Sequence, residues 1–184
     1  MQNKTQVFPL PGSIFVHNRL THSLEVSCVG RSLGNKIASE LLKLHPELHD
    51  THISEIGSIV SAACLAHDLG NPPFGHSGEK PSAHISEGKG RTLQAYLSAK
   101  EWDDFTHFEG NAKRIPSAYP PVSRRRPGGF VSTYATLAAI VKYPFSSQLA
   151  GSKQKFGFFT SEEEAFQKIA HELGLKKISK EGEP

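Results

Sequence analysis

The stretch LAHDLGNPPFGHSGE, residues 65–79, determines the fold expected for the chain, because it ends a helix on a His-Asp pair and then turns sharply. Apolar residues upstream recur at the helical spacing i, i+3, i+4, i+7 and i+8, which predicts a helix over residues 54–69 with one buried face: Ile56, Ile59, Val60, Ala63 and Cys64. His67 continues this series, so its imidazole is expected to point inward beside Asp68. Gly70 suits the C-terminal cap, and the two prolines that follow prevent the helix from continuing.

The chemistry of this stretch points to a metal. A buried imidazole next to a buried carboxylate is costly unless something compensates it, and a divalent cation is the usual compensation. His76 and Glu79 follow on the stiff turn, so two more titratable groups are expected near the His-Asp pair. This combination predicts a catalytic site.

The composition indicates one ordinary globular domain. The chain has 184 residues, of which 37% are apolar and 21% charged. We expect a cytoplasmic protein with no membrane contact, because no apolar run is long enough to span a bilayer and no signal peptide is present. The net charge of +3 permits an anionic substrate without requiring nucleic acid. Cys28 and Cys64 are expected to be buried free thiols, with a disulfide or a structural zinc site as the alternative.

The rest of the chain predicts a mostly α-helical domain over residues 1–184, since strand signals are scarce. A helix is expected over residues 21–44, with Leu33, Ile37 and Leu41 on one side. Further helices are expected at 92–99, at 130–142, and from a capping box of Ser161 and Glu164 to a stop at Gly174. Residues 113–129 combine arginines with prolines and glycines, so an irregular basic loop is expected there.

Other polar residues have an ordinary structural interpretation when each is taken alone. His22 lies in the first turn of its helix, where a surface or capping role is common. Arg19 fits either an anion contact or solvent. The histidines of residues 45–53 suit a polar loop. Lys142 at a helix C-terminus suits the helix dipole. The basic loop leaves single-stranded nucleic acid as a weakly supported partner, because no aromatic platform accompanies it.

Four sequence blocks change this interpretation when they are taken together. They are HNRLTHSLEV at 17–26, HDLGNPPFGHSGE at 67–79, HFEGN at 107–111 and LAAIVKYP at 137–144. In this order they resemble the deoxyguanosinetriphosphate triphosphohydrolase (dGTPase) family of the HD-domain metal phosphohydrolases. The resemblance covers residues 1–80, 100–112 and 128–175.

The resemblance implies an HD-domain helical fold and a nucleotide site. The family hydrolyses a deoxynucleoside triphosphate to the deoxynucleoside and inorganic triphosphate, with Mg²⁺ or Mn²⁺ as the cofactor. Carried over to this sequence, the family's functional residues fall into a metal group (His22, His67, Asp68), a catalytic group (His76, Glu79, His107) and a substrate-binding group (Arg19, Lys142, Tyr143, Gln2).

The sequence also departs from the family pattern. The family's fourth metal ligand is an aspartate far beyond the His-Asp pair, and no aspartate follows Asp104 in this chain. We therefore expect an N-terminal portion whose fold is incomplete at the C-terminus and which is inactive alone, whereas the full-length form would be an active homo-oligomer. Two alternatives stay open: another HD-type nucleotidase or phosphodiesterase, and a non-catalytic nucleotide-binding module.

Overall fold

The computed structural model describes residues 18–72, 91–112, 132–150 and 155–176, and these residues form helices and loops without any strand. This confirms the mostly α-helical class. No helix in these ranges is long and apolar enough to cross a membrane. The elements are α1 (Arg19–Leu44), η1 (Pro46–Leu48), η2 (His52–Glu55), α2 (Ile56–Ala66), α4 (Arg91–Gln94), α5 (Ala99–Thr106), α7 (Tyr134–Ile140), η3 (Ser147–Leu149), η5 (Thr160–Glu162) and α8 (Glu163–Glu172), where η marks a 3₁₀ helix.

Helix α1 begins two residues before the predicted start, at Arg19, because Asn18 caps it. The Asn18 side chain accepts from the backbone N–H groups of Leu20 and Thr21 at 3.0 and 2.9 Å, and the Thr21 hydroxyl lies 3.1 Å from the Asn18 backbone nitrogen. This reciprocal capping satisfies donors that a helix start otherwise leaves unpaired. It also fixes the first turn, which carries Arg19 and His22.

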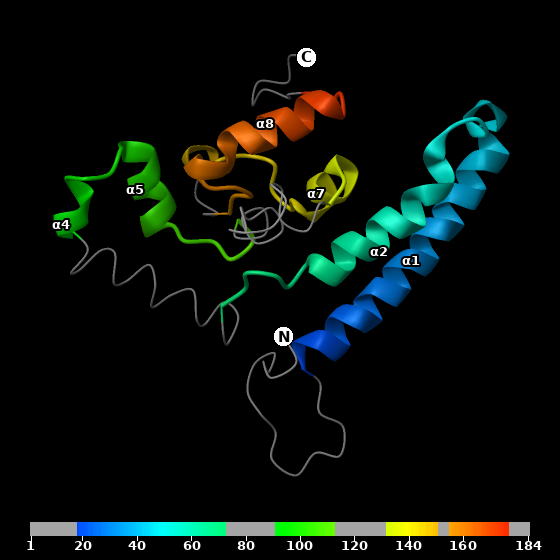
Figure 1. The fold of residues 1–184 in the computed structure, drawn as a ribbon, viewed down its shortest axis with the longest axis horizontal. Coiled ribbons are helices and arrows are strands. Elements are labelled where there is room, and N and C mark those ends of the chain that lie inside the picture. Colours follow the sequence, from blue (N-terminus) through cyan, green and yellow to red (C-terminus); the bar gives the residue numbers. More distant parts are fainter. Residues whose placement is uncertain (1–17, 73–90, 113–131, 151–154, 177–184) are drawn as a thin grey trace, which may run out of the picture.

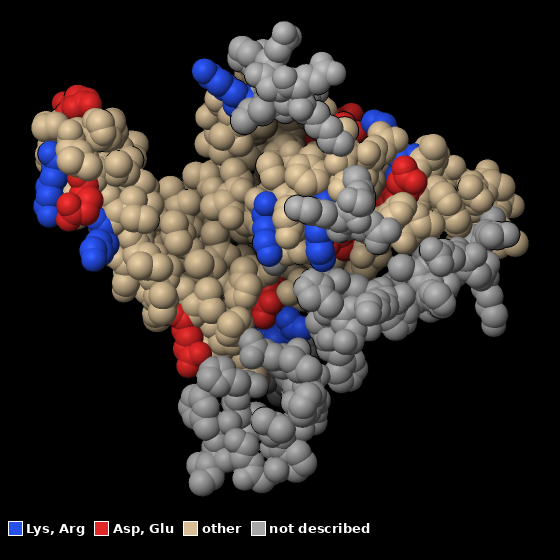
Figure 2. Space-filling model, turned by 180° about the vertical axis from the view of Figure 1, so that it is seen from behind, with Lys and Arg blue, Asp and Glu red and all other residues tan. Residues whose placement is uncertain are grey.

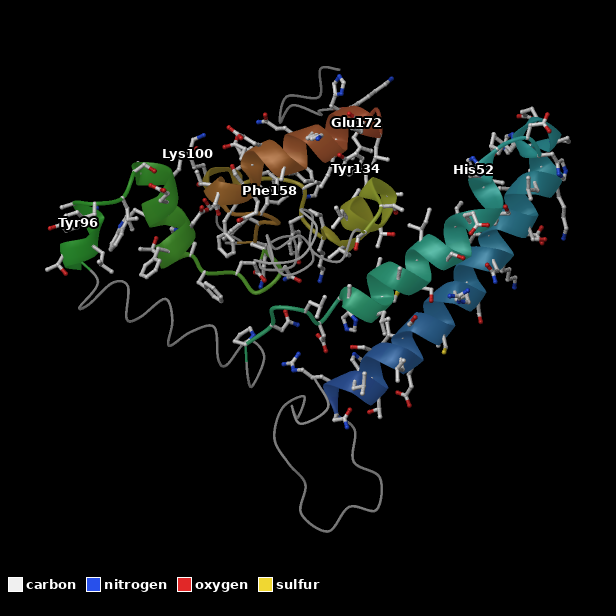
Figure 3. The ribbon with its side chains drawn as sticks, viewed as in Figure 1. His52, Tyr96, Lys100, Tyr134, Phe158 and Glu172 are labelled. Carbon is white, nitrogen blue, oxygen red and sulfur yellow. The ribbon has the colours of Figure 1, made fainter. Side chains whose placement is uncertain are left out.

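Helices α1 and α2 form a hairpin that projects from the rest of the fold (Figure 1). Figure 3 shows His52 near the closed end of this hairpin, where the chain turns from α1 toward α2. Leu33, Ile37 and Leu41 lie on one side of α1 as predicted, but Leu33 and Ile37 are 58% and 54% exposed, so the buried side of the helix is another one. The buried residues of α1 are instead small, apart from Arg19 at its start: Ser23, Ser27, Gly30, Gly34 and Ala38.

Small residues let the two helices of the hairpin approach closely. A Cβ atom on Gly34 would lie 2.8 Å from the Gly57 Cα, and one on Gly30 would lie 2.7 Å from the Cys64 Sγ. Ser27 donates to the Ser61 carbonyl oxygen at 2.9 Å across the same contact. Larger side chains on this face would therefore force the helices apart.

Helix α2 ends at Ala66, earlier than the predicted 54–69, and η2 replaces its predicted first turn. Residues 67–70 continue as turns, and Gly70 has a φ of 81°, a conformation that favours glycine. The predicted burial of both cysteines is wrong for Cys28, which is exposed, and Cys64 is half-buried; both thiols are free.

A small hydrophobic core joins α2 to α7 and α8. Its buried residues are Ala63, Leu137, Ile140 and Ile169. Helix α7 is shorter than the predicted 130–142. The predicted capping box at the start of the last helix is wrong, because η5 precedes α8 and the Ser161 hydroxyl donates to the Glu162 carboxylate at 2.6 Å. The predicted stop at Gly174 is confirmed by its φ of 63°.

Helices α4 and α5 replace the single helix predicted over 92–99, because Ser98 and Glu101 form a capping box that starts α5 at Ala99. Long-range contacts then attach α5 and the loop after it to the C-terminal part. The Asp104 carboxylate accepts from the Thr160 backbone N–H at 2.6 Å, and Lys155 pairs with the buried Glu109 at 2.6 Å. Figure 3 shows Lys100 on α5 facing α8, where it pairs with Glu163 at 3.4 Å.

Candidate metal centre

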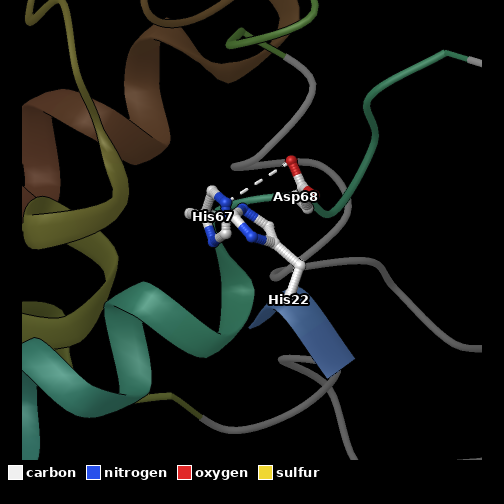
Figure 4. A group of neighbouring side chains, drawn as sticks. All are labelled: His22, His67 and Asp68. Atoms are coloured by element: carbon white, nitrogen blue, oxygen red, sulfur yellow. Dashed lines mark ion pairs between the residues drawn. The ribbon is translucent and has the colours of Figure 1, made fainter. Parts of the chain in front are cut away.

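The structure brings His22, His67 and Asp68 together although the two histidines are 45 positions apart in sequence (Figure 4). One ligand atom from each of the three side chains lies within 4.8 Å of the others. Two ligands on opposite sides of a metal ion lie about 4.0–4.4 Å apart when each bond is 2.0–2.2 Å long. The three side chains therefore need only a small closure to share one ion.

His67 is held in the orientation that a metal ligand needs. It follows directly after α2, and its Nδ1 lies 2.5 Å from the Cys64 carbonyl oxygen. A carbonyl oxygen only accepts, so Nδ1 carries the proton of the neutral ring and Nε2 keeps a free lone pair. The His22 ring approaches edge-on from α1, with 5.2 Å between the ring centroids. The pair thus presents imidazole nitrogens from α1 and from the residue after α2 to one point.

Asp68 completes the group with a carboxylate whose two oxygens have different neighbours. Oδ1 accepts from the Asn71 side-chain amide at 2.7 Å and lies 3.5 Å from the His67 Nε2, the contact drawn in Figure 4. Oδ2 pairs with the Arg19 Nη1 at 3.2 Å. The side chain is only 10% exposed. This half-buried carboxylate can bind a cation, and its charge is balanced in the structure by the Arg19 guanidinium.

The donor set fits a divalent transition metal. Two imidazole nitrogens and one carboxylate oxygen suit borderline ions such as Mn²⁺. In the described part of the chain, no other group of three His, Cys, Asp or Glu side chains converges in this way. A separate hollow of about 480 Å³, lined by Ala38, Leu42 and His49 among others, lies toward the opposite end of the hairpin.

The predicted third active-site histidine lies outside this group. His107 follows the last residue of α5, and its Nδ1 lies 3.1 Å from the Asp103 carbonyl oxygen. As in His67, this contact leaves Nε2 available. The next residues anchor the loop, because Glu109 is 1% exposed and accepts from the Asn111 backbone N–H at 3.1 Å. His107 is thus held firmly, but not as a member of the metal group.

Lys142 and Tyr143 lie beyond α7 rather than in its last turn. The Lys142 ammonium sits 5.4 Å from the centroid of the Tyr143 ring, in cation–π range. Tyr143 in turn packs against Phe145, and Gly157 fits so close to the Tyr143 carbonyl that no other residue has room there. The pair forms one unit fixed to the C-terminal part of the fold.

Several predicted residues lie outside the described part of the chain: Gln2, His76, Glu79 and the basic loop 113–129. On the face seen in Figure 2, the described acidic and basic side chains are scattered, with no extended patch of one sign. Sequence reasoning missed Asn71 and the Cys64 carbonyl as partners of the metal group. An Asn three residues after the aspartate was the available signal for Asn71, whereas a backbone carbonyl leaves no trace in sequence.

Comparison with known proteins agrees with this geometry. Residues 19–114 match the family model described as HD domain. A "Deoxyguanosinetriphosphate triphosphohydrolase-like protein" of Pseudomonas aeruginosa strain LESB58 is 44% identical over 97% of the chain and 41% of the relative. A protein of the same description from Synechocystis is 42% identical over 95% of the chain and 42% of the relative. A "Deoxyguanosinetriphosphate triphosphohydrolase" of Yersinia enterocolitica is 33% identical over 98% and 42%. The chain thus spans about two fifths of the length of these curated relatives.

Proposed function

The chain belongs to the HD-domain family, and from that premise and its similarity to dGTPase-like proteins we propose that it contributes the metal centre of a deoxynucleoside triphosphate triphosphohydrolase. The family and the convergent side chains support a metal-dependent phosphohydrolase. The finer proposal is the reaction, in which a deoxynucleoside triphosphate such as dGTP gives the deoxynucleoside and intact inorganic triphosphate. The observation that carries it is the convergence of His22, His67 and Asp68.

The three side chains would hold one Mn²⁺ or Mg²⁺ ion, and their two imidazoles favour Mn²⁺. When bound, such an ion polarises a phosphoryl oxygen and lowers the pKa of a bound water. The contribution of the chain itself is orientation. The Cys64 carbonyl fixes the His67 ring, and Asn71 and Arg19 fix the Asp68 carboxylate, so that the donor atoms converge before any ion arrives.

The remaining roles form part of the same proposal. His76 and Glu79 act as the proton-transfer pair, and His107 offers its Nε2 to a phosphate oxygen or to the departing sugar oxygen. Lys142 and Arg19 place positive charge near the triphosphate, and the Tyr143 ring holds the Lys142 ammonium by a cation–π contact. Gln2 would contact the sugar or the base.

Metal titration of the 184-residue chain tests the centre of the proposal. We expect one Mn²⁺ per chain in isothermal titration, and loss of that binding in His67→Ala and in His22→Ala. His52→Ala, which alters a histidine of η2 outside the metal group, is the matched control and should bind normally. Equal Mn²⁺ affinity in the His67 and His52 variants would refute the metal centre.

Product analysis tests the reaction itself. We propose that hydrolysis requires a protein of the relatives' length, which supplies a further metal ligand, and that residues 1–184 alone turn over little or no substrate. With that longer protein, dGTP should give inorganic triphosphate and deoxyguanosine. Release of orthophosphate would instead indicate a nucleotidase, and nucleotide binding without any product would indicate a binding module.

A further inference from the structure

Arg19 is the first residue of α1 and is only 4% exposed, which is unusual for an arginine. Its guanidinium reaches from α1 to the turn that follows α2. Nη1 pairs with the Asp68 Oδ2 at 3.2 Å, and Nη2 donates to the Pro72 carbonyl oxygen at 3.1 Å. The planar fork of arginine suits such a bridge, whereas a lysine ammonium carries its charge at one point. Arg19 thus joins the start of α1 to the turn that follows α2.

The bridge divides the two oxygens of Asp68 between two directions. Oδ2 turns toward Arg19, and this leaves Oδ1 as the oxygen beside the His67 Nε2, at 3.5 Å. Asn71 donates to Oδ1 at 2.7 Å and supports the same rotation. The carboxylate is therefore held with one oxygen facing the histidines.

The backbone of Arg19 is itself fixed, so the side chain has a firm base. Asn18 caps the first turn of α1, and the buried Ser23 hydroxyl donates to the Arg19 carbonyl oxygen at 2.7 Å. The Arg19 Nε is buried and has no hydrogen-bond partner. An unpaired buried donor costs free energy, so the contacts of Arg19 with Asp68 and Pro72 must offset that cost.

We infer that Arg19 is a positioning residue for the metal centre, which sets the orientation of Asp68 and anchors the turn of residues 68–72. This role is separate from contact with a phosphate, and it rests on the metal centre proposed above. The direction in which removal of Arg19 changes the metal affinity distinguishes a positioning role from simple charge balance. A guanidinium that only neutralised Asp68 would repel an incoming divalent cation, so its removal would tighten metal binding. A guanidinium that orients Asp68 has the opposite effect.

The experiment is Mn²⁺ titration of the 184-residue chain carrying Arg19→Gln, with Arg31→Gln as the matched control. Arg31 lies on the same helix and is exposed. Loss of a group that orients a metal ligand weakens binding about 10–100-fold, and we expect this loss for Arg19→Gln and none for Arg31→Gln. Arg19→Lys keeps the charge without the bridge, so its affinity should fall between those of Arg19→Gln and the unsubstituted chain.

Two further measurements separate positioning from loss of the fold. Guanidinium chloride, at concentrations far below those that unfold the chain, should restore part of the Mn²⁺ affinity of Arg19→Ala, while sodium chloride should not. Without metal, hydrogen exchange at the backbone amides of Leu69 and Asn71 should speed up in Arg19→Gln. If Arg19→Gln fails to fold, Arg19→Lys carries the test.

The outcomes point to different errors. Mn²⁺ affinity in Arg19→Gln that equals or exceeds that of the unsubstituted chain would overturn the positioning role and leave the metal centre standing. Failure of the unsubstituted chain to bind Mn²⁺ at all would refute the metal centre itself.

Discussion

Replacement of Gly34 by alanine tests whether the close contact of α1 and α2 holds the fold and the metal centre together. Gly34 is buried in the middle of α1, where the backbone of α2 passes directly over it. In most helices this substitution stabilises by about 1 kcal/mol, because alanine is the better helix former. Here the new Cβ atom would lie 2.8 Å from the Gly57 Cα and 3.1 Å from its backbone nitrogen.

The expected magnitude follows from this geometry. Carbon atoms in contact prefer about 3.5–4.0 Å, so the two backbones would have to separate by several tenths of an ångström or more. Overpacking of this kind costs about 1–3 kcal/mol. After subtracting the gain in helix propensity, we expect a net loss of up to about 2 kcal/mol in the free energy of unfolding.

Urea unfolding followed by circular dichroism measures this loss. Ser32→Ala, at an exposed position on the outward side of α1, is the control and should change stability by less than about 0.5 kcal/mol. Because His22 lies on α1 and His67 directly follows α2, Gly34→Ala should also weaken Mn²⁺ binding. A Gly34→Ala chain about 1 kcal/mol more stable than the unsubstituted one, which is the full gain in helix propensity, would refute the close-contact argument.

Three other predictions concern separate parts of the molecule. In a protein of the relatives' length, His76→Ala or Glu79→Ala should lower kcat by about 10²–10⁴ and leave Mn²⁺ affinity unchanged in titration; loss of metal binding would assign the residue to the metal instead. Lys155→Met should cost about 3–5 kcal/mol in urea unfolding, because it leaves the Glu109 carboxylate buried without its cation, and a second change, Glu109→Gln, should recover much of the loss. A double variant no more stable than Lys155→Met alone would show that the loss of stability does not come from the broken Lys155–Glu109 pair. Burial, followed by a neighbouring carboxylate, raises the pKa of Glu162, so the stability associated with its protonated form is complete below its unfolded pKa and is lost as the pH rises through the raised value. The difference in stability between Glu162→Gln and the unsubstituted chain should therefore favour the variant more at neutral pH than at about pH 4. Thermal melts in which both proteins change stability with pH in parallel would contradict this.

The sequence predicts the helical class and the metal group better than it predicts which surfaces pack. Periodicity of large apolar residues grouped Leu33 and Ile37 on one side of their helix, yet both are exposed. The contact of α1 with α2 follows a stripe of glycine, serine and alanine, which hydrophobicity does not detect but which helical spacing would have revealed. The distinction matters because small residues allow close approach, whereas large ones only fill space.

Helix starts were predicted less well for a local reason. Both Asn18 and Ser98 begin helices by reciprocal capping, and neither start was predicted. Ser161 and Glu164 carry the same residue spacing, but the chain forms a 3₁₀ turn there, since the Ser161 hydroxyl bonds to the adjacent Glu162. A four-residue pattern cannot distinguish these outcomes, because the competing partner is another side chain nearby.

The candidate site, like the fold, was predicted from the sequence only in part. His22, His67 and Asp68 were predicted to converge, and the structure places their ligand atoms together. The pairing of Arg19 with Asp68 was not predicted, since it depends on how α1 and α2 align along the hairpin. Contacts between residues 49 positions apart follow from that alignment and not from any local pattern.

The position of the metal group on one hairpin has a consequence for the order of folding. All three candidate ligands lie between residues 22 and 68, on α1 and on the turn that directly follows α2. Their convergence therefore uses no residue of α7 or α8, and it closes a shorter loop than a contact with either of those helices would. During synthesis this segment leaves the ribosome before the C-terminal helices exist, and domains and their parts fold as they emerge. An ion captured at that stage would clamp the hairpin and provide the surface on which the later helices dock.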